Sequence, residues 1–451
     1  MDTEANKQMA RQIAEQVAAV GGRAYYVGGS VRDQLLNREN KDIDIEIHGV
    51  APQILMDLLD ELGERTVMGA SFGIFGLKHY ELDISMPRKA SEHGGGKRDF
   101  CDFVDPFVGT EAAARRRDLT MNALMQDVLT GEILDFFGGE NDLKQGVIRH
   151  VDAASFREDP LRVIRAAQFA ARFGFSVAEE TMGLCRNIDL SGLPRERVFG
   201  ELEKALLQSP RPSVFFQTLR QMEQLSPWFG EVEALIGVEQ DPIHHPEGDV
   251  WNHTMAVLDA AANLRDQAQK PLYFMLAALC HDFGKVHATQ KENGRIRSLG
   301  HEEAGLPLAK TFLFRLTGEV RLQQYVENMV LLHMRPNLLA AQKSKAKATC
   351  SLFDRSVCPE DLLLLAKADH FGKQDAWAYD TAEQFLQAAL ALFRERMAQP
   401  CVMGADLVEA GFQPGAAFRE ALAYAHKLRL AGVKKEEALK QTVAYLKKMP
   451  H

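Results

Sequence analysis

The chain has 451 residues, 46% of them hydrophobic and 25% charged, with a formal net charge of −9 at pH 7. This composition predicts a globular protein of roughly two to four domains. Its acidic balance excludes RNA binding through overall positive charge, so any RNA site must be a local basic surface. There is no signal peptide or membrane-spanning apolar run, and the six cysteines lack Cys-x-x-Cys spacing. We therefore expect a cytoplasmic protein without membrane contact.

A strand, a glycine turn and the start of a helix are predicted over residues 26–33, after an amphipathic helix over residues 8–20. Gly28 and Gly29 carry no Cβ, so the backbone of the turn can approach a ligand closely. The start of the helix offers unpaired N–H groups to an anion. Arg32, in the first turn, can bind a phosphate with two hydrogen bonds. These features predict a phosphate-binding turn.

The next predicted strand carries Asp42 and Asp44. Side chains two residues apart on a strand point to the same face, so the two carboxylates converge. Such a pair suits Mg²⁺ bridged to substrate phosphates, which indicates nucleotidyl or phosphoryl transfer. Each motif alone is more often a plain turn or a solvated strand edge, whereas the combination is more specific. After a helix over residues 55–62, two further strands are predicted, and the second carries Asp83 as a third carboxylate or as a solvent-facing residue.

The pattern Gly-Gly-x-Val-Arg-Asp-x-Leu-Leu, followed by Asp-x-Asp, resembles the opening motif of the class II nucleotidyltransferases. These are the tRNA CCA-adding enzymes and the bacterial poly(A) polymerases. The resemblance implies an α+β head, a polymerase-β-type palm with a five-stranded mixed sheet and helices. It also implies that Asp42 and Asp44 are catalytic. The polar, glycine-rich residues 87–105 predict a mobile loop, which in such enzymes takes part in the switch to adding A; an ordinary surface insertion is the alternative.

Three successive arginines, Arg115 to Arg117, precede Asp118 and fit a polyphosphate or an RNA backbone. Asp118 and Asn122 are four residues apart, so on a helix they share a face, and the carboxylate can accept hydrogen bonds from ribose hydroxyls. The segment resembles the second family motif, Arg-Arg-Asp-Phe-Thr-x-Asn-Ala, with Leu in place of Phe. Strands over residues 131–135 and 147–150 are expected to close the head.

From residue 155 the composition shifts to helix, and Asp159, Arg162 and Arg165 are spaced three apart on one face. The carboxylate of Asp159 can accept from the exocyclic amine that C and A share, and Arg162 can donate to base acceptors. Alternatively, Asp159 before Pro160 is an N-cap. The resemblance of Glu-Asp-x-x-Arg to the base-reading motif of the family favours nucleotide selection by Asp159 and Arg162. Arg117 and Arg165 would then contact the triphosphate.

A second group of residues comprises His253, the adjacent His281 and Asp282 at the end of an apolar helix, and Asp369. Imidazole and carboxylate together bind divalent transition metals, and a bound metal activates water for phosphoester hydrolysis. The order His, His-Asp, Asp resembles the HD phosphohydrolases, and His301 and His333 could complete a two-metal version. The alternative is an HD domain that persists as a scaffold.

The resemblance covers nearly the whole chain and implies a head over residues 1–150, followed by all-α regions. These are a base-reading neck (151–215), an HD body (216–400) and a tRNA-binding tail (401–451), which carries five lysines between residues 434 and 448. The implied activity is template-independent addition of C, C and A to tRNA from CTP and ATP with Mg²⁺. The HD domain implies hydrolysis of phosphomonoesters or 2′,3′-cyclic phosphates with a transition metal.

Three alternatives stay open at this point. A poly(A) polymerase, or a partial enzyme that adds only CC or only A, shares the opening motifs. A phosphohydrolase with a nucleotide-sensing head is a second possibility, although the intact Asp pair argues against it. A non-catalytic tRNA-binding chaperone is a third. The expected oligomeric state is a monomer or a homodimer.

Overall fold

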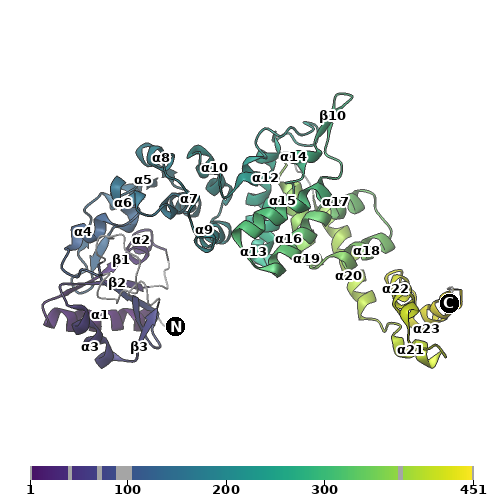
Figure 1. Ribbon diagram of the computed structural model, residues 1–451, viewed down its shortest axis with the longest axis horizontal. Helices are drawn as coiled ribbons and strands as arrows, with labels where there is room; N and C mark the ends of the chain where they lie inside the picture. Colours follow the sequence, from purple (N-terminus) through teal and green to yellow (C-terminus); the bar gives the residue numbers. More distant parts are fainter. Residues whose placement is uncertain (1–2, 39–42, 69–73, 88–103, 374–378, 449–451) are drawn as a thin grey trace. The chain divides into compact units, whose positions relative to one another are not determined.

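The computed structural model describes residues 3–38, 43–68, 74–87, 104–373 and 379–448 (Figure 1). The chain divides into two compact units. The first unit comprises residues 1–193 and 214–224, and the second comprises residues 194–213 and 225–451.

The first unit is built on a mixed sheet with the strand order β3-β4-β5-β2-β1-β6-β7. β2 and β5 pair in parallel, and the other neighbours in the sheet pair antiparallel. The sheet has seven strands rather than the expected five, with β3 and β7 at its two edges, paired with β4 and β6. The strands are β1 (Arg23–Val27), β2 (Ile43–His48), β3 (Arg65–Met68), β4 (Ile74–Leu77), β5 (Leu82–Ser85), β6 (Met125–Asp127) and β7 (Ile133–Leu134).

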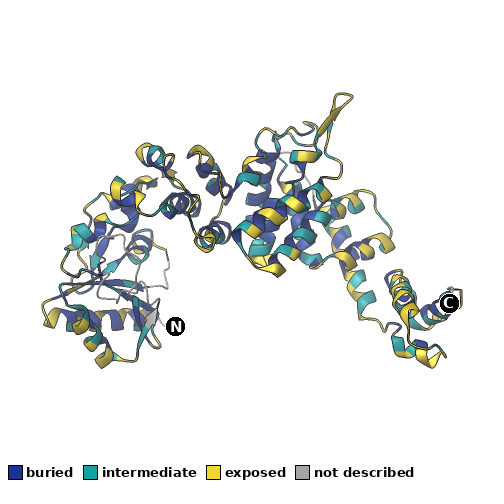
Figure 2. Ribbon diagram, viewed as in Figure 1, coloured by how far each residue is buried: buried dark blue, intermediate teal, exposed yellow. Residues whose placement is uncertain are grey.

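The two faces of β2 show how the sequence sets up the site. Ile43, Ile45 and Ile47 belong to a buried apolar cluster that also includes side chains of the two helices covering this face, α1 (Thr3–Ala19) and α3 (Pro52–Leu62) (Figures 1 and 2). Burying an isoleucine side chain stabilises the fold by about 2–3 kcal/mol. Because side chains alternate along a strand, Asp44 and Glu46 point to the opposite face. The expected helices over residues 8–20 and 55–62 are confirmed by α1 and α3.

A strand is present within the expected residues 147–150, but it lies outside the seven-stranded sheet. β8 (Val147–Ile148) pairs in parallel with β9 (Ser176–Val177) in a separate two-stranded sheet. α5 (Gly139–Gln145) precedes β8 in the chain. Its C-cap residue, Gly146, has φ 68°, a left-handed conformation that favours glycine, and the chain changes direction there. The other helical segments of this unit are α2 (Gly29–Leu35), α4 (Thr110–Arg115), η2 (Thr120–Asn122), α6 (Ala153–Arg157), α7 (Leu161–Phe173), α8 (Glu179–Cys185) and most of α10 (Ser213–Gln221).

Within its described residues, the second unit is helical apart from one hairpin, β10 (Gln290–Glu292) and β11 (Arg295–Arg297). The hairpin was not predicted, although Asn293 and Gly294, both with positive φ, are its sequence signal. At the centre of the unit, every residue from Phe274 to Cys280 is buried. The helical segments are α9 (Arg195–Gln208), α11 (Gly230–Glu233), α12 (Val250–Ala262), η3 (Arg265–Gln267), α13 (Pro271–Cys280), α14 (Lys285–Ala288), α15 (His301–Leu316), α16 (Val320–Leu332), α17 (Met334–Ala341), α18 (Ala346–Arg355), α19 (Pro359–Phe371), α20 (Asp380–Ala398), α21 (Gly404–Glu409), α22 (Ala416–Leu430) and α23 (Lys435–Leu446).

The expected order of an α+β head followed by helical regions is therefore present. Among the described residues, none of the helices combines the length and the apolar character needed to cross a membrane.

Candidate functional site

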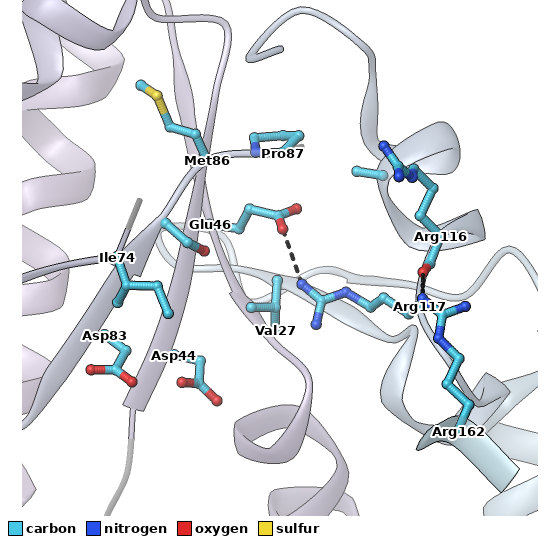
Figure 3. Close-up of a pocket in the computed structure, with 12 residues that line it drawn as sticks. Val27, Asp44, Glu46, Ile74, Asp83, Met86, Pro87, Arg116, Arg117 and Arg162 are labelled. Atoms are coloured by element: carbon cyan, nitrogen blue, oxygen red, sulfur yellow. Dashed lines mark hydrogen bonds and ion pairs between the residues drawn. The ribbon is translucent and has the colours of Figure 1, made fainter. Parts of the chain in front are cut away.

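A cavity of about 410 Å³ lies on the polar face of the head sheet (Figure 3). Strands β1, β2, β4 and β5 supply one wall, and residues of α4, the turn after it and α7 supply the other. Acidic side chains therefore face basic ones across the cavity. The lining residues are Val27, Asp44, Glu46, Ile74, Asp83, Ser85, Met86, Pro87, Ala113, Arg116, Arg117 and Arg162.

Two of the predicted carboxylates meet in this cavity. Asp44 on β2 and Asp83 on β5 are direct partners in the parallel strand pair, and Figure 3 shows their side chains next to each other. The backbone N–H of Asp44 donates to the hydroxyl of Ser30 at 3.0 Å, which ties β2 to the start of α2. Asp42 immediately precedes β2 and lies outside the described residues, as does most of the predicted loop over residues 87–105.

The glycine turn lies against this carboxylate pair. Gly28 has φ 63°, a conformation that favours glycine, and a Cβ there would lie 3.2 Å from Nη1 of Arg117 and 4.0 Å from Oδ2 of Asp44. Gly29 begins α2. The turn therefore brings backbone close to both the acidic and the basic wall of the cavity.

Glu46 is a cavity residue to which the sequence analysis gave no role. Its Oε2 accepts from Nη2 of Arg117 at 3.1 Å (Figure 3), and its Oε1 lies 2.9 Å from Nε2 of His48. Burial acts to raise the pKa of Glu46, but Arg117 and His48 hold it below its usual value. The alternation Asp44-x-Glu46 was the signal that could have identified it, since the two residues share a face.

Arg32 is buried, with 4% of its surface exposed. Its guanidinium donates to Oδ1 of Asn122 at 2.7 Å and to Oδ1 of Asp33 at 2.8 Å, and it lies over the rings of Phe169 and Phe173. Burial lowers the pKa of Arg32, although Asp33 opposes this effect. The structure therefore places Arg32 in a network of protein partners, and its contact with a triphosphate stays a prediction.

Asp118 lies at the centre of the same network. Its Oδ1 accepts from the backbone N–H of Leu119 at 2.8 Å and from Asn122 at 3.0 Å, and its Oδ2 accepts from Nε of Arg165 at 2.8 Å. Burial acts to raise the pKa of Asp118, yet Arg165 and these hydrogen bonds hold it below its usual value. The interpretation of an α-helical face for Asp118 and Asn122 is wrong, because Leu119 is extended and only residues 120–122 form a 3₁₀ turn.

The predicted base-reading pair has structural partners as well. Oδ1 of Asp159 accepts from the backbone N–H of Leu161, the first residue of α7, at 3.2 Å. Arg162 lines the cavity and donates to the carbonyls of Ser155 at 2.8 Å and Arg116 at 2.7 Å (Figure 3). These bonds fix the orientation of Arg162. The alternative of Asp159 as N-cap with Pro160 as the first helical residue is wrong by one residue, because Pro160 is the N-cap of α7 and no side chain caps it. Base reading by Asp159 stays a prediction.

In the second unit, the predicted HD residues converge. Nε2 of His253 on α12 lies 3.1 Å from Oδ1 of Asp369 on α19, and Nε2 of His281, which follows α13, lies 3.2 Å from Oδ2 of Asp282. His301 at the start of α15 joins them, with its Nε2 3.3 Å from Oδ1 of Asp282.

His333 completes a second set of ligand atoms. Nε2 of His333 lies 3.3 Å from Nε2 of His301 and 3.7 Å from Oδ1 of Asp282. Among the described residues, three groups of side chains could each hold a metal ion, since the ligand atoms within each group lie within 4.8 Å of one another. Two of them consist of predicted residues, namely His253, His281 and Asp369 in one group and Asp282, His301 and His333 in the other. The third group shares His253 and adds His245 and Glu247.

The donor set fits divalent transition metals. Within the described part of the chain, Nε2 of His281 and both carboxylate oxygens of Asp282 are buried without a hydrogen bond of good geometry, although Nζ of Lys285 forms an ion pair with Oδ2 of Asp282 at 2.6 Å. Buried ligand atoms in this state fit a bound metal ion. Burial acts to raise the pKa of Asp282, but His281 and Lys285 hold it well below its usual range. Burial and the neighbouring His281 lower the pKa of His333 to about 3, so its imidazole is neutral and able to bind a metal.

Glu247 was also given no role at the sequence level. It is buried in the turn before α12, and its Oε1 lies 2.7 Å from Nδ1 of His253 and 2.8 Å from Nδ1 of His245. In the sequence, the one feature that could have indicated Glu247 is its position six residues before His253, a predicted metal ligand.

The two sites define a nucleotidyltransferase head joined to an HD domain, and known families agree with this class. The poly A polymerase head domain family matches residues 24–149, and the HD domain family matches residues 250–372. The multifunctional CCA protein of Pasteurella multocida (strain Pm70) is 38% identical over 411 residues, which cover 87% of this chain and 92% of that protein. The chain therefore belongs to the multifunctional CCA protein family.

Solved structures agree on the fold. The Bacillus stearothermophilus CCA-adding enzyme in complex with CTP matches with a TM-score of 0.67 at 21% identity, covering 98% of this chain and 99% of that one. The Thermotoga maritima CCA-adding enzyme complexed with tRNA matches with a TM-score of 0.63 at 20% identity, covering 97% of this chain and 95% of that one. The predicted family and fold class are confirmed.

Proposed function

We propose that this protein adds C, C and A to the 3′ end of tRNA without a nucleic-acid template, using CTP and ATP and releasing pyrophosphate. The observation that carries the proposal is the pairing of Asp44 with Asp83 in a cavity beside the Gly28 turn. The head that holds this cavity belongs to the poly A polymerase head family, and a relative with 38% identity is a multifunctional CCA protein.

Asp42, Asp44 and Asp83 are the proposed ligands of Mg²⁺, because carboxylate oxygens are the donors that this ion prefers. When bound, Mg²⁺ neutralises triphosphate charge and makes the tRNA 3′-hydroxyl a better nucleophile. Gly28 and Gly29 let the backbone approach the phosphates. Arg32, Arg117 and Arg165 are the proposed cations for the triphosphate. Glu46 holds Arg117 in the cavity.

Nucleotide selection is assigned to the other wall of the cavity. Asp159 and Arg162 are proposed to read the base edge, and the bonds of Arg162 to Ser155 and Arg116 support a fixed orientation for such reading. Asp118 is proposed to sense the ribose, with Asn122 bonded to it at 3.0 Å. A fixed side chain reads hydrogen-bond patterns more selectively than a mobile one.

The second proposed function is metal-dependent hydrolysis of phosphomonoesters or 2′,3′-cyclic phosphates by the HD site. The buried Asp282 oxygens and the converging Nε2 atoms support it. His253, His281, Asp282 and Asp369, together with His301 and His333, would hold the metal. A bound transition metal supplies an activated water for attack on phosphorus.

The remaining proposals concern organisation and setting. The head is proposed to cover residues 1–150, the neck 151–215, the HD body 216–400 and the tRNA-binding tail 401–451. The lysines of α23 and its flanks would contact RNA phosphates. The buried free thiols of Cys185, Cys280, Cys350 and Cys358 fit a reducing cytoplasm. The protein would act as a monomer or a homodimer.

Reciprocal variants test the two sites in the full chain. Asp42→Ala combined with Asp44→Ala is expected to abolish incorporation of labelled CTP and ATP into tRNA lacking its 3′ end, while phosphatase activity persists. Asp282→Ala is expected to abolish phosphatase activity while nucleotide incorporation persists. Asp57→Ala, at an exposed position on α3, serves as the control. Survival of both activities in the double variant would overturn the assignment of the head. Offering CTP and ATP separately and together distinguishes full CCA addition from CC, A or poly(A) addition.

A further inference from the structure

The four histidines of the HD site share one orientation. Each turns Nε2 toward the ligand cluster and Nδ1 away from it. In three of them, Nδ1 faces a backbone carbonyl of its own or a neighbouring turn. The pairs are His281 with Ala278 O at 2.8 Å, His301 with Ser298 O at 2.8 Å, and His333 with Val330 O at 2.7 Å.

A carbonyl oxygen only accepts hydrogen bonds, so these three Nδ1 atoms carry the proton. The lone pair of each imidazole then lies on Nε2, where a metal needs it. The main chain supplies this acceptor in all three, so no side-chain substitution can remove it, although Oε2 of Glu302 also lies 3.4 Å from Nδ1 of His301.

His253 differs from the other three, because its Nδ1 faces the carboxylate of Glu247 at 2.7 Å instead of a carbonyl. Its Nε2 lies 3.1 Å from Asp369 Oδ1, and both residues belong to one of the groups that could hold a metal ion. We propose that Glu247 is a positioning residue of the HD site, which keeps the proton of His253 on Nδ1 and aims its Nε2 at the metal. The inference rests on the proposed metal-dependent hydrolase function.

The surroundings of Glu247 support this role. Its side chain is 2% exposed, and burying a carboxylate is costly unless it is hydrogen-bonded. Oε1 has both histidines as partners, whereas Oε2 is buried without a hydrogen bond to any described residue. The turn that carries it is fixed by Asp249, whose carboxylate caps α12 at Asn252 N (2.9 Å) and accepts from Gly237 N (2.7 Å). A buried carboxylate on a turn held by these hydrogen bonds is suited to orienting an imidazole.

His245 distinguishes a positioning role of Glu247 from direct metal binding, because His245, Glu247 and His253 form one of the groups that could hold a metal ion. Its Nδ1 lies 2.8 Å from the same oxygen of Glu247 that faces His253. His245 is half-buried and lies at the edge of the cluster. Removing its side chain therefore takes one hydrogen bond from Glu247 and leaves the bond between Glu247 and His253 in place.

The test measures binding of Co²⁺ to the metal-stripped full-length protein by calorimetry and by the visible absorption of the bound ion. Loss of an outer-shell carboxylate typically weakens metal affinity by about 10–100-fold. Glu247→Ala is expected to show this loss. Glu247→Gln, which keeps an acceptor oxygen without the charge, is expected to lose less, and His245→Ala is expected to stay within about twofold of the wild type.

A second readout separates positioning from misfolding. Phosphatase activity of Glu247→Ala is expected to recover when Co²⁺ is raised above the weakened dissociation constant, and nucleotide addition by the head is expected to stay at the wild-type level. Tight Co²⁺ binding by the wild type and by both Glu247 variants alike would overturn this inference alone. Failure of the wild type to bind Co²⁺ would overturn the proposed hydrolase site and the inference with it.

Discussion

Asp118 is a buried carboxylate whose bonds to Arg165, Asn122 and the Leu119 amide exist only in the folded chain. These bonds hold its folded pKa below the unfolded value of about 3.9. A carboxylate with a depressed folded pKa stabilises the fold above the unfolded pKa. This contribution is lost as the pH falls through the folded pKa.

Asp118→Asn is therefore expected to lower the free energy of unfolding by about 3 kcal/mol near neutral pH, since it leaves Arg165 without its buried partner. The difference from the wild type is expected to shrink as the pH falls below the unfolded pKa of about 3.9, because the unfolded wild type then binds a proton that the folded carboxylate resists. Urea unfolding between neutral pH and about pH 3 measures both quantities. Asp57→Asn, at an exposed position, should show little difference at any pH. A difference for Asp118→Asn that is constant with pH would contradict the expectation.

Glu46 provides a kinetic prediction at the same scale. A charge-assisted hydrogen bond such as that from Arg117 to Glu46 contributes about 1.5 kcal/mol or more, which corresponds to roughly tenfold in binding. Glu46→Gln is expected to raise the KM for CTP and ATP by about this factor and to change kcat less, because Arg117 is less well held. Steady-state incorporation into tRNA measures both constants. Ser85→Ala, in the same cavity wall, is the control, and an unchanged KM in Glu46→Gln would refute the role.

The sequence predicted individual site residues wherever short spacing decides the geometry. Asp44 shares a strand with its motif, and His281 and Asp282 are adjacent, so periodicity and order were sufficient. The sequence did not predict which distant residues these side chains contact. Arg117 and Glu46 are 71 residues apart, and Arg165 and Asp118 are 47 apart, so only the folded packing brings them together. The local turn predicted Arg32 as a phosphate-binding residue. The sequence could not predict its burial against α7, because that contact also depends on the folded packing.

At the scale of elements, the close approach of α14 and α15 depends on one glycine. A Cβ at Gly284 would lie 1.9 Å from the carbonyl oxygen of His301 and 2.5 Å from the backbone nitrogen of Gly305. Separations below 3.0 Å from backbone atoms require the two segments to move apart. Such a movement shifts His301 relative to Asp282, and Nε2 of His301 lies 3.3 Å from Oδ1 of Asp282 in the HD site.

Gly284→Ala is therefore expected to destabilise the second unit by about 1–3 kcal/mol through overpacking and to weaken Co²⁺ binding. Thermal unfolding and Co²⁺ titration measure the two effects. Gly200→Ala in α9, where a Cβ meets nothing within 4 Å, is the control. It should be neutral or stabilising by up to about 1 kcal/mol, because alanine favours a helix interior. Wild-type stability in Gly284→Ala would show that α14 and α15 do not need this contact.

Elements were predictable when their own pattern was long. The alternation of β2 and the 3.6-residue period of α1 are such cases. β8 was misplaced because a two-residue strand has no pattern of its own, and its partner, β9, lies almost 30 residues further on. The short strand β7 joins the sheet by pairing with β6, its neighbour in the sequence, in a hairpin.

At the scale of the whole molecule, the two units carry donor sets of different chemistry. The head cavity offers carboxylates, Asp44, Glu46 and Asp83 among the described residues, whereas the second unit combines imidazole with carboxylate. Carboxylate oxygens suit Mg²⁺, which keeps most of its water and binds substrate phosphates. Imidazole nitrogens favour later divalent transition metals. The two activities should therefore respond differently to metals within one chain.

After chelation of all metals from the full-length protein, Mg²⁺ alone is expected to restore nucleotide addition without restoring phosphatase activity. Co²⁺ at low concentration is expected to restore the phosphatase, because the histidine-containing set binds it far more tightly than Mg²⁺. Parallel assays on one metal-stripped preparation measure both, and the Asp42→Ala, Asp44→Ala double variant confirms that the recovered phosphatase is independent of the head. Restoration of both activities by Mg²⁺ alone would show that the second unit does not use its imidazoles to select a transition metal, and the assignment of distinct metals to the two units would fail.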